Sequence, residues 1–300
     1  MPALSPDQHA AYARDGFLAG VRVFDAETTL RLRAEVEALE KHPGDEAGGR
    51  PIRQFMRVNG HVVVPLMAEL ARTPAILDAV ESILGPNLLV WSVEFFIKEP
   101  GVKKIVSWHQ DLTYWGMGET DDEVTAWVAL SDVSVEAGCM RFLPGSHKGG
   151  IVKHNDTFAE DNLLSRGQVI EGVDEEKAAY GALKPGEMSL HHGRCFHASG
   201  PNMSDDRRIG LVIRYVTPEV RAEVGGRDYA MLVRGVDEVG GWTHIAGARD
   251  MLNAADLALY DRILAEQAKT LAAGAEDKVA LYRAAPGMRA GQGAGAAAGM

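Results

Sequence analysis

The sequence has few cysteines, fewer basic than acidic residues and no long apolar run. Only Cys139 and Cys195 are cysteines among 300 residues, which excludes a disulfide framework and favours a reducing compartment. Lysine and arginine number 31 against 42 aspartates and glutamates, so the formal net charge is −11. Nucleic acids and anionic membrane surfaces require a basic protein surface, so neither partner is expected. No apolar stretch approaches the roughly 18 residues that would indicate a membrane span.

The N-terminal stretch MPALSPDQHAAYARDG lacks the basic region followed by an apolar region that marks a secretory signal. We therefore expect a cytoplasmic protein. Hydrophobic residues make up 46% of the chain, enough to bury a large core. We expect one domain over residues 1–285, followed by a disordered tail over 286–300, where the sequence is of low complexity.

Capping signals predict helices in the first part of the chain. Ser5-Pro6 begins one that Gly16 ends, Asp25 caps another over residues 26–42, and a third lies between Thr73-Pro74 and Gly85-Pro86. Residues 1–86 are accordingly expected to be largely helical, apart from an extended segment at 16–24. A closing helix is expected over 254–272, within a C-terminal extension that spans 218–285.

From residue 87 onward the pattern changes to short apolar or alternating runs. These runs are rich in valine, isoleucine and aromatic residues, and Pro-Gly turns at 100–101, 144–145 and 185–186 separate them. The pattern predicts a core over 87–217 that is an antiparallel sandwich or barrel, and a mainly β protein with flanking helices (α+β). A long insertion at about 148–180 is expected to form a lid or binding loop.

One stretch, SWHQDLTYW at residues 107–115, places a histidine and a carboxylate one residue apart. Side chains i and i+2 of a strand lie on the same face, so His109 and Asp111 are expected to point the same way. An imidazole beside a carboxylate supplies two metal ligands. Such pairs are common by chance, so a metal site requires a third ligand from elsewhere.

A second cluster, SLHHGRCFHASGPN, offers His191, His192 and His197 as that third ligand. His191 and His192 are neighbours in an expected strand and face opposite sides, so at most one of them faces the site. Two histidines and one carboxylate form the triad typical of non-haem Fe(II) oxygenases, which leaves coordination positions open for a co-substrate and O2.

Iron of this type needs a two-electron donor, usually 2-oxoglutarate, whose far carboxylate requires a cation. Arg208 lies eleven residues after His197, and a guanidinium holds a carboxylate through two parallel hydrogen bonds. Arg208 is therefore the candidate for this role. Its neighbour Arg207 is expected to be a solvated charge, and Arg214 has no predicted role.

These features together resemble the phytanoyl-CoA dioxygenase family over about residues 87–217. The motifs that carry the resemblance are His109-Gln110-Asp111, Trp127 in TAWVAL, GCMRFLPGSHK at 138–148, HASGPN from His197, and Arg208. The resemblance implies a double-stranded β-helix, a jelly-roll of cupin type, and an oxygenase that uses Fe(II), 2-oxoglutarate and O2. The expected reaction hydroxylates an unactivated C–H bond of a small-molecule metabolite and releases succinate and CO2.

The resemblance also implies roles for individual residues. The iron ligands would be His109, Asp111 and His197. The residues that would bind 2-oxoglutarate are Arg208, Ser199 and Trp127, with Lys98 as a weaker candidate. Related halogenases have alanine or glycine in place of the carboxylate, so Asp111 predicts a hydroxylase and not a halogenase.

Substrate contacts are predicted from position alone. The residues expected to face the substrate are Tyr114, Trp115, Phe158, Asn162 and Arg166. A small polar or zwitterionic metabolite is favoured over an acyl-CoA, because no cluster of lysine and arginine is reserved for phosphates. Two other functions stay open: a cupin-like isomerase or hydrolase that does not use 2-oxoglutarate, and a non-catalytic metabolite-binding relative.

Overall fold

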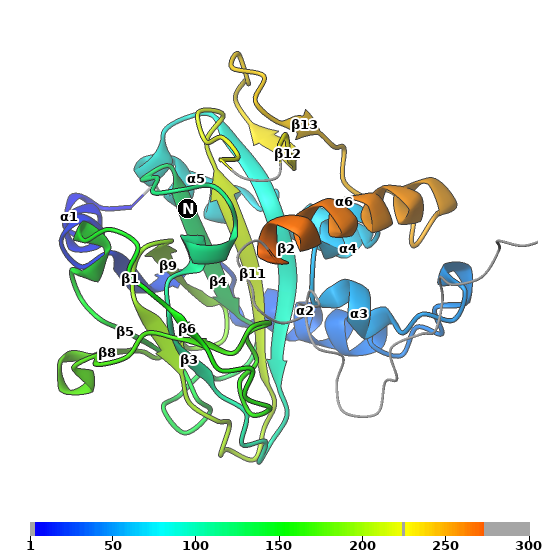
Figure 1. Cartoon of the computed structure of the whole chain (residues 1–300). Helices are drawn as coiled ribbons and strands as arrows, with labels where there is room; N and C mark the ends of the chain where they lie inside the picture. The colour runs from blue at the N-terminus through cyan, green and yellow to red at the C-terminus, as the bar shows by residue number, and fades with distance from the viewer. Residues whose placement is uncertain (1–3, 224–225, 273–300) are drawn as a thin grey trace, which may run out of the picture.

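The computed structural model describes residues 4–223 and 226–272 (Figure 1). Its α-helices are α1 (Pro6–Asp15), α2 (Ala26–Leu39), α3 (Ile52–Met56), α4 (Pro65–Leu70), α5 (Pro74–Leu84) and α6 (Ala254–Ala272). Ser5 caps α1 by accepting a hydrogen bond from the Gln8 amide, and Gly16 ends the helix at a φ of 81°. The four predicted helices are confirmed, whereas the short α3 and α4 were not predicted.

Most strands form a large and a small antiparallel sheet that face each other, and two short strands form a separate two-stranded sheet. The strands are β1 (Phe17–Arg22), β2 (Leu88–Lys98), β3 (Val106–His109), β4 (Glu123–Ala129), β5 (Met140–Phe142), β6 (Asn155–Asp156), β7 (Gln168–Val169), β8 (Ala179–Gly181), β9 (Glu187–His192), β10 (His197–Ser199), β11 (Arg208–Val216), β12 (Tyr229–Arg234) and β13 (Thr243–His244). The large sheet has the order β1-β9-β4-β11-β2-β12-β13, and the small sheet β3-β10-β5-β8. Only the short β12–β13 pair is parallel among the described strands. The mainly β class and the jelly-roll core are thus confirmed.

The two faces of the large sheet have different environments. On β11, Ile209, Leu211 and Ile213 belong to the main apolar core, which also contains residues of the N-terminal helices. The alternate residues Arg208 and Arg214 line a cavity on the other face. Figure 1 shows α2, α3 and α4 on one side of the long strands β2 and β11, with the small sheet on the other. The functional site therefore lies between the sheets, on the face of the large sheet opposite α2, α3 and α4.

One detail differs from the sequence-based expectation. The strand that carries His109 ends at that residue, and Asp111 begins a 3-10 turn over Asp111–Tyr114 instead of continuing the strand. The insertion at 148–180 contains only the small β6–β7 sheet, a 3-10 turn and the edge strand β8. The predicted tail at 286–300 lies outside the described residues, and the division into parts at 86, 217 and 285 stays a prediction.

Candidate metal centre and its cavity

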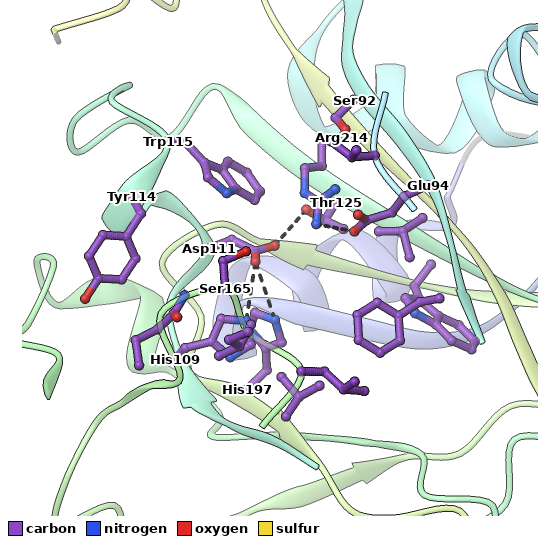
Figure 2. Close-up of a pocket in the computed structure, with 18 of the residues that line it drawn as sticks. Ser92, Glu94, His109, Asp111, Tyr114, Trp115, Thr125, Ser165, His197 and Arg214 are labelled. Carbon is purple, nitrogen blue, oxygen red and sulfur yellow. Dashed lines mark hydrogen bonds and ion pairs between the residues drawn. The ribbon is translucent and has the colours of Figure 1, made fainter. Parts of the chain in front are cut away.

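Two strands of the small sheet bring together histidines that are far apart in the sequence. His109 ends β3, His197 begins β10, and the two residues are partners across the antiparallel ladder. Asp111 joins them from the turn that follows β3. One ligand atom from each of the three residues lies within 4.8 Å of the others (Figure 2). The structure thus assembles two imidazoles and one carboxylate in the combination that suits a divalent metal.

The two imidazoles are oriented by backbone carbonyls. His109 Nδ1 lies 2.9 Å from the Ser107 carbonyl oxygen, and His197 Nδ1 lies 3.0 Å from that of Cys195. A carbonyl oxygen only accepts hydrogen bonds, so each Nδ1 carries the proton and each Nε2 presents a lone pair. Both lone pairs are therefore available to a metal ion, and the residues present fit one.

The two oxygens of Asp111 have different neighbours. Oδ1 faces the candidate ligands, at 3.5 Å from His109 Nε2 and 3.8 Å from His197 Nε2. Oδ2 accepts a hydrogen bond from Thr125 Oγ1 at 3.1 Å and lies 3.4 Å from His191 Nε2. One oxygen is thus directed toward the metal position, while the other is held by the protein.

Burial and mutual charge set the protonation states of this cluster. Burial, together with the neighbouring imidazoles of His109 and His191, lowers the pKa of His197 well below its usual value. Burial alone would raise the pKa of Asp111, but the surrounding imidazoles and Arg214 hold it well below the usual range. A neutral imidazole and an ionised carboxylate are the forms that bind a metal.

Arg208 lies in the same cavity as a fully buried cation with 1% of its surface exposed. Its Nη1 donates to the Gly138 carbonyl, and its Cζ lies 5.3 Å from the Trp127 ring centroid and 5.6 Å from that of Phe96. Its Nε has no hydrogen-bond partner among the described residues. Burial lowers the pKa of Arg208 to about 10, so it is still charged at neutral pH. A buried guanidinium with an unsatisfied N–H is suited to bind an anionic ligand.

Lys98 lies behind Arg208 and interacts with the strand that carries His197. Its Nζ donates to Ser199 Oγ at 2.9 Å and to the Gly200 carbonyl at 2.6 Å. Burial and the nearby Arg208 lower its pKa to about 6. Ser199 and Trp127 line the cavity, whereas Lys98 reaches it only through Ser199.

The cavity has a volume of about 140 Å³ and contains both the triad and Arg208. Its walls come from the large sheet, from the turn after β3, from residues 163–165 of the insertion, and from the end of α6. Figure 2 shows Tyr114 and Trp115 on one side of Asp111 and Glu94 on the other. The end of α6 and the insertion are linked, because Arg166 donates to the Leu271 carbonyl at 3.2 Å.

The predicted substrate-facing residues divide into two groups. Tyr114 and Trp115 line the cavity. Phe158, Asn162 and Arg166 are not among the lining residues, so their contact with a substrate stays a prediction. The side chain of Asn162 donates to Ser107 Oγ at 2.7 Å, and Arg166 forms an ion pair with Asp156, so both brace the insertion. The neighbouring residues Leu163, Leu164 and Ser165 face the cavity in their place.

Two cavity residues were given no role in the sequence analysis: Arg214 and Glu94, which form an ion pair on the cavity wall. His191, one of the two neighbouring histidines considered for the site, contacts Asp111. The signal was available for Arg214, because it lies six residues after Arg208 on one strand and an even spacing places both on the same face. Arg207, expected to be solvated, instead forms ion pairs with Glu40 and Glu99.

Comparison with known proteins agrees with this architecture. A family model described as phytanoyl-CoA dioxygenase matches residues 12–210, about two thirds of the chain. The chain belongs to the phytanoyl-CoA dioxygenase family. A curated relative from Bordetella parapertussis named ectoine dioxygenase is 33% identical over 239 residues, which cover 72% of this chain and 77% of the relative.

Solved structures extend the similarity to most of the chain. The apo structure of the non-heme monooxygenase ThoJ has 32% identity and a TM-score of 0.78, and the match covers 88% of this chain and 97% of ThoJ. A structure titled CytC3 with Fe(II) and alpha-ketoglutarate has 25% identity and a TM-score of 0.59, and the match covers 80% of this chain and 92% of CytC3. No helix among the described residues has the length and apolar character to cross a membrane.

Proposed function

We propose that this protein is an Fe(II)- and 2-oxoglutarate-dependent dioxygenase that hydroxylates an unactivated C–H bond of a small-molecule metabolite. The observation that carries the proposal is that the two-histidine, one-carboxylate cluster and the buried Arg208 face one cavity. Membership of the family supports it, as does the similarity to CytC3, which was solved with both Fe(II) and alpha-ketoglutarate.

In this proposal each side chain has a defined task. His109, Asp111 and His197 would hold Fe(II), and Arg208 would bind the far carboxylate of 2-oxoglutarate. Trp127 and Ser199 would line the co-substrate site, with Lys98 behind them. When bound, the iron and 2-oxoglutarate supply the activation of O2 and the oxidation of the substrate C–H bond. The protein orients the reactants and excludes water, because the wall around Arg208 is aromatic and buried.

The test is binding followed by turnover. Fe(II) and 2-oxoglutarate, added together without oxygen, are expected to give a visible metal-to-ligand absorption band, and admission of O2 should release succinate. The double variant His109→Ala/Asp111→Ala should lose both signals. His244→Ala/Asp237→Ala serves as the matched control, because it removes a histidine–aspartate pair that does not line the cavity. Full succinate release by the first double variant would refute the assignment.

The alternative reading, a cupin-like isomerase or hydrolase that does not use 2-oxoglutarate, has no need of a cation at the position of Arg208. The unsatisfied Nε of that buried guanidinium favours a carboxylate ligand instead. A metal-loaded protein that transforms its substrate without consuming 2-oxoglutarate would favour the alternative. The cytoplasmic location stays a prediction.

A further inference from the structure

A buried ion pair lies on the cavity wall beside the metal centre. Arg214 Nη2 donates to Glu94 Oε1 at 2.6 Å, and the two residues are 9% and 2% exposed. Both line the cavity, and the ring of Trp115 covers the guanidinium, with its centroid 4.8 Å from Cζ. Replacing such a pair with apolar residues is often neutral or stabilising in proteins. Its position in the cavity therefore points to ligand binding and not to stability.

Glu94 has one carboxylate oxygen that no described residue satisfies. Oε1 accepts from Arg214, but Oε2 is buried without a hydrogen-bond partner. A buried, unsatisfied carboxylate oxygen is costly, so a ligand that supplies a donor gains from filling this position. A protonated primary or secondary amine carries N–H donors, whereas a quaternary ammonium has none.

Charge balance indicates what else the ligand carries. Glu94 and Arg214 are neutral as a pair, so a ligand with a single charge would add uncompensated charge to a buried wall. A ligand with both signs of charge avoids this cost, because each of its groups meets an opposite one. The guanidinium of Arg214 is suited to bind a carboxylate of the ligand, since a guanidinium presents donors on two edges and binds carboxylates in a defined geometry.

We propose that Glu94 and Arg214 form the substrate subsite, and that the substrate is a small zwitterion of amino-acid type. Its protonated amine would donate to Glu94 Oε2, and its carboxylate would pair with Arg214. This inference rests on the proposed function, in which Arg208 is already assigned to 2-oxoglutarate. The ion pair, the triad and Arg208 all line the same cavity, so the proposed substrate subsite and the co-substrate site open into one space.

The test uses ligand sets built on shared carbon skeletons. For each skeleton, the free amino acid, its amide, its N-acetyl derivative and its N-acetyl amide are zwitterionic, cationic, anionic and neutral. Binding to the anaerobic Fe(II)–2-oxoglutarate protein is followed by the shift of the absorption band and by calorimetry. At least one free amino acid is expected to bind about ten- to a hundredfold more tightly than its three derivatives.

Variants connect this preference to the two residues. Glu94→Gln should weaken binding of the zwitterion, because the glutamine side chain has no negative charge to pair with the protonated amine of the ligand. For the same reason it should reduce discrimination against the N-acetyl derivative. Arg214→Gln should reduce discrimination against the amide of the ligand. The matched controls are Glu99→Gln and Arg207→Gln, which alter an ion pair outside the cavity and should leave both preferences intact. If a single variant fails to fold, Glu94→Gln/Arg214→Gln removes both charges together and should bind the neutral derivative as well as the zwitterion.

The inference is overturned if no free amino acid binds, if the derivatives bind equally well, or if Glu94→Gln leaves the preference unchanged. An increase in the KM for 2-oxoglutarate with no change in ligand preference in Arg214→Gln would also overturn it, since Arg214 would then serve the co-substrate. The proposed function fails separately. A failure of the unsubstituted protein to bind 2-oxoglutarate in an Fe(II)-dependent manner, with no substrate present, would refute the proposed function whatever the ligand preference.

Discussion

The two carboxylate oxygens of Asp111 have different partners. Oδ1 faces His109 and His197, while Oδ2 is occupied by Thr125 and His191. Residues behind a metal ligand fix its orientation and its basicity. His191 has this position here, and its own Nδ1 is buried without a partner among the described residues, which is consistent with a proton on Nε2.

Replacement of His191 by phenylalanine should therefore weaken metal binding by about tenfold, because Asp111 loses one of the two groups that hold Oδ2. Competition for Co(II) or Fe(II) against a chelator of known affinity measures the effect. The adjacent His192 faces the other way and contacts Asp121, so His192→Phe is the control with expected normal affinity. Equal affinity in both variants would show that His191 does not orient the carboxylate.

Arg208→Lys should mainly raise the KM for 2-oxoglutarate. The lysine keeps a positive charge but loses the planar fork that binds a carboxylate through two hydrogen bonds. Initial rates at varied 2-oxoglutarate concentration measure the change, with Arg207→Lys as the neighbouring control. An unchanged KM in Arg208→Lys would be evidence against its role as the anchor.

The sequence was sufficient to single out the His109–Asp111–His197 triad and Arg208, which converge on the cavity, because their chemistry and spacing are distinctive. It was not sufficient for His191. The argument that only one of His191 and His192 can face the site was sound, but His191 faces it without being one of the three clustered ligands. Glu94 was missed because an acidic residue in an apolar strand gives no sign of its partner, which lies 120 residues away.

The strand β11 illustrates how one element serves both the core and the site. Its odd-numbered residues from Ile209 to Tyr215 pack into the apolar core, while Arg208 and Arg214 line the cavity. Between them lies Gly210, and the Trp127 ring on β4 occupies the space that a side chain at this position would need. The glycine is thus required by the close approach of the ring to the backbone.

Gly210→Ala should destabilise the protein by about 1–3 kcal/mol, because the added methyl group overlaps the Trp127 ring within a packed wall. Urea unfolding measures the loss. Gly200→Ala is the control, since no atom lies within 4 Å of the added carbon at that position. Equal stability of the two variants would mean that the ring moves aside at no cost.

Helices with local sequence signals were more predictable than the turns and loops of the site. Helices α1, α2 and α5 were predicted from local signals at their ends. Side chains cap α1 and α2, whereas α5 begins with Pro74 and has no side-chain cap. The 3-10 turn at Asp111 was not, because its geometry depends on contacts with distant strands, such as the hydrogen bond from the Leu112 amide to the Gly193 carbonyl. Residues 163–165 were likewise not singled out, since a loop without periodicity gives no face to assign.

At the scale of the whole molecule, buried histidines make stability depend on pH. His61 lies in the turn Gly60–Val62 of the helical layer, and neither of its ring nitrogens has a partner among the described residues. Burial and Arg72 lower its pKa to about 3, from 6.5. Below pH 6.5 the unfolded chain therefore binds more protons than the folded protein, so the free energy of unfolding should fall as the pH is lowered.

The variant His61→Leu should reduce this acid sensitivity. The slope of unfolding free energy against pH, measured by urea unfolding at pH values between about 6.5 and 4, should decrease by up to about 1.4 kcal/mol per pH unit. The exposed histidine at position 9 provides the control variant, His9→Leu. A slope that stays the same in His61→Leu would indicate that other groups dominate the acid response.

The pairing of β3 with β10 has a consequence for how the protein acquires its ion. His109 and His197 become neighbours only when strands separated by most of the jelly-roll have closed against each other, and Arg208 follows on the next strand. A growing chain on the ribosome cannot present the triad until residues beyond 200 have emerged. A site with all three ligands therefore forms late in folding, after β10 has paired with β3.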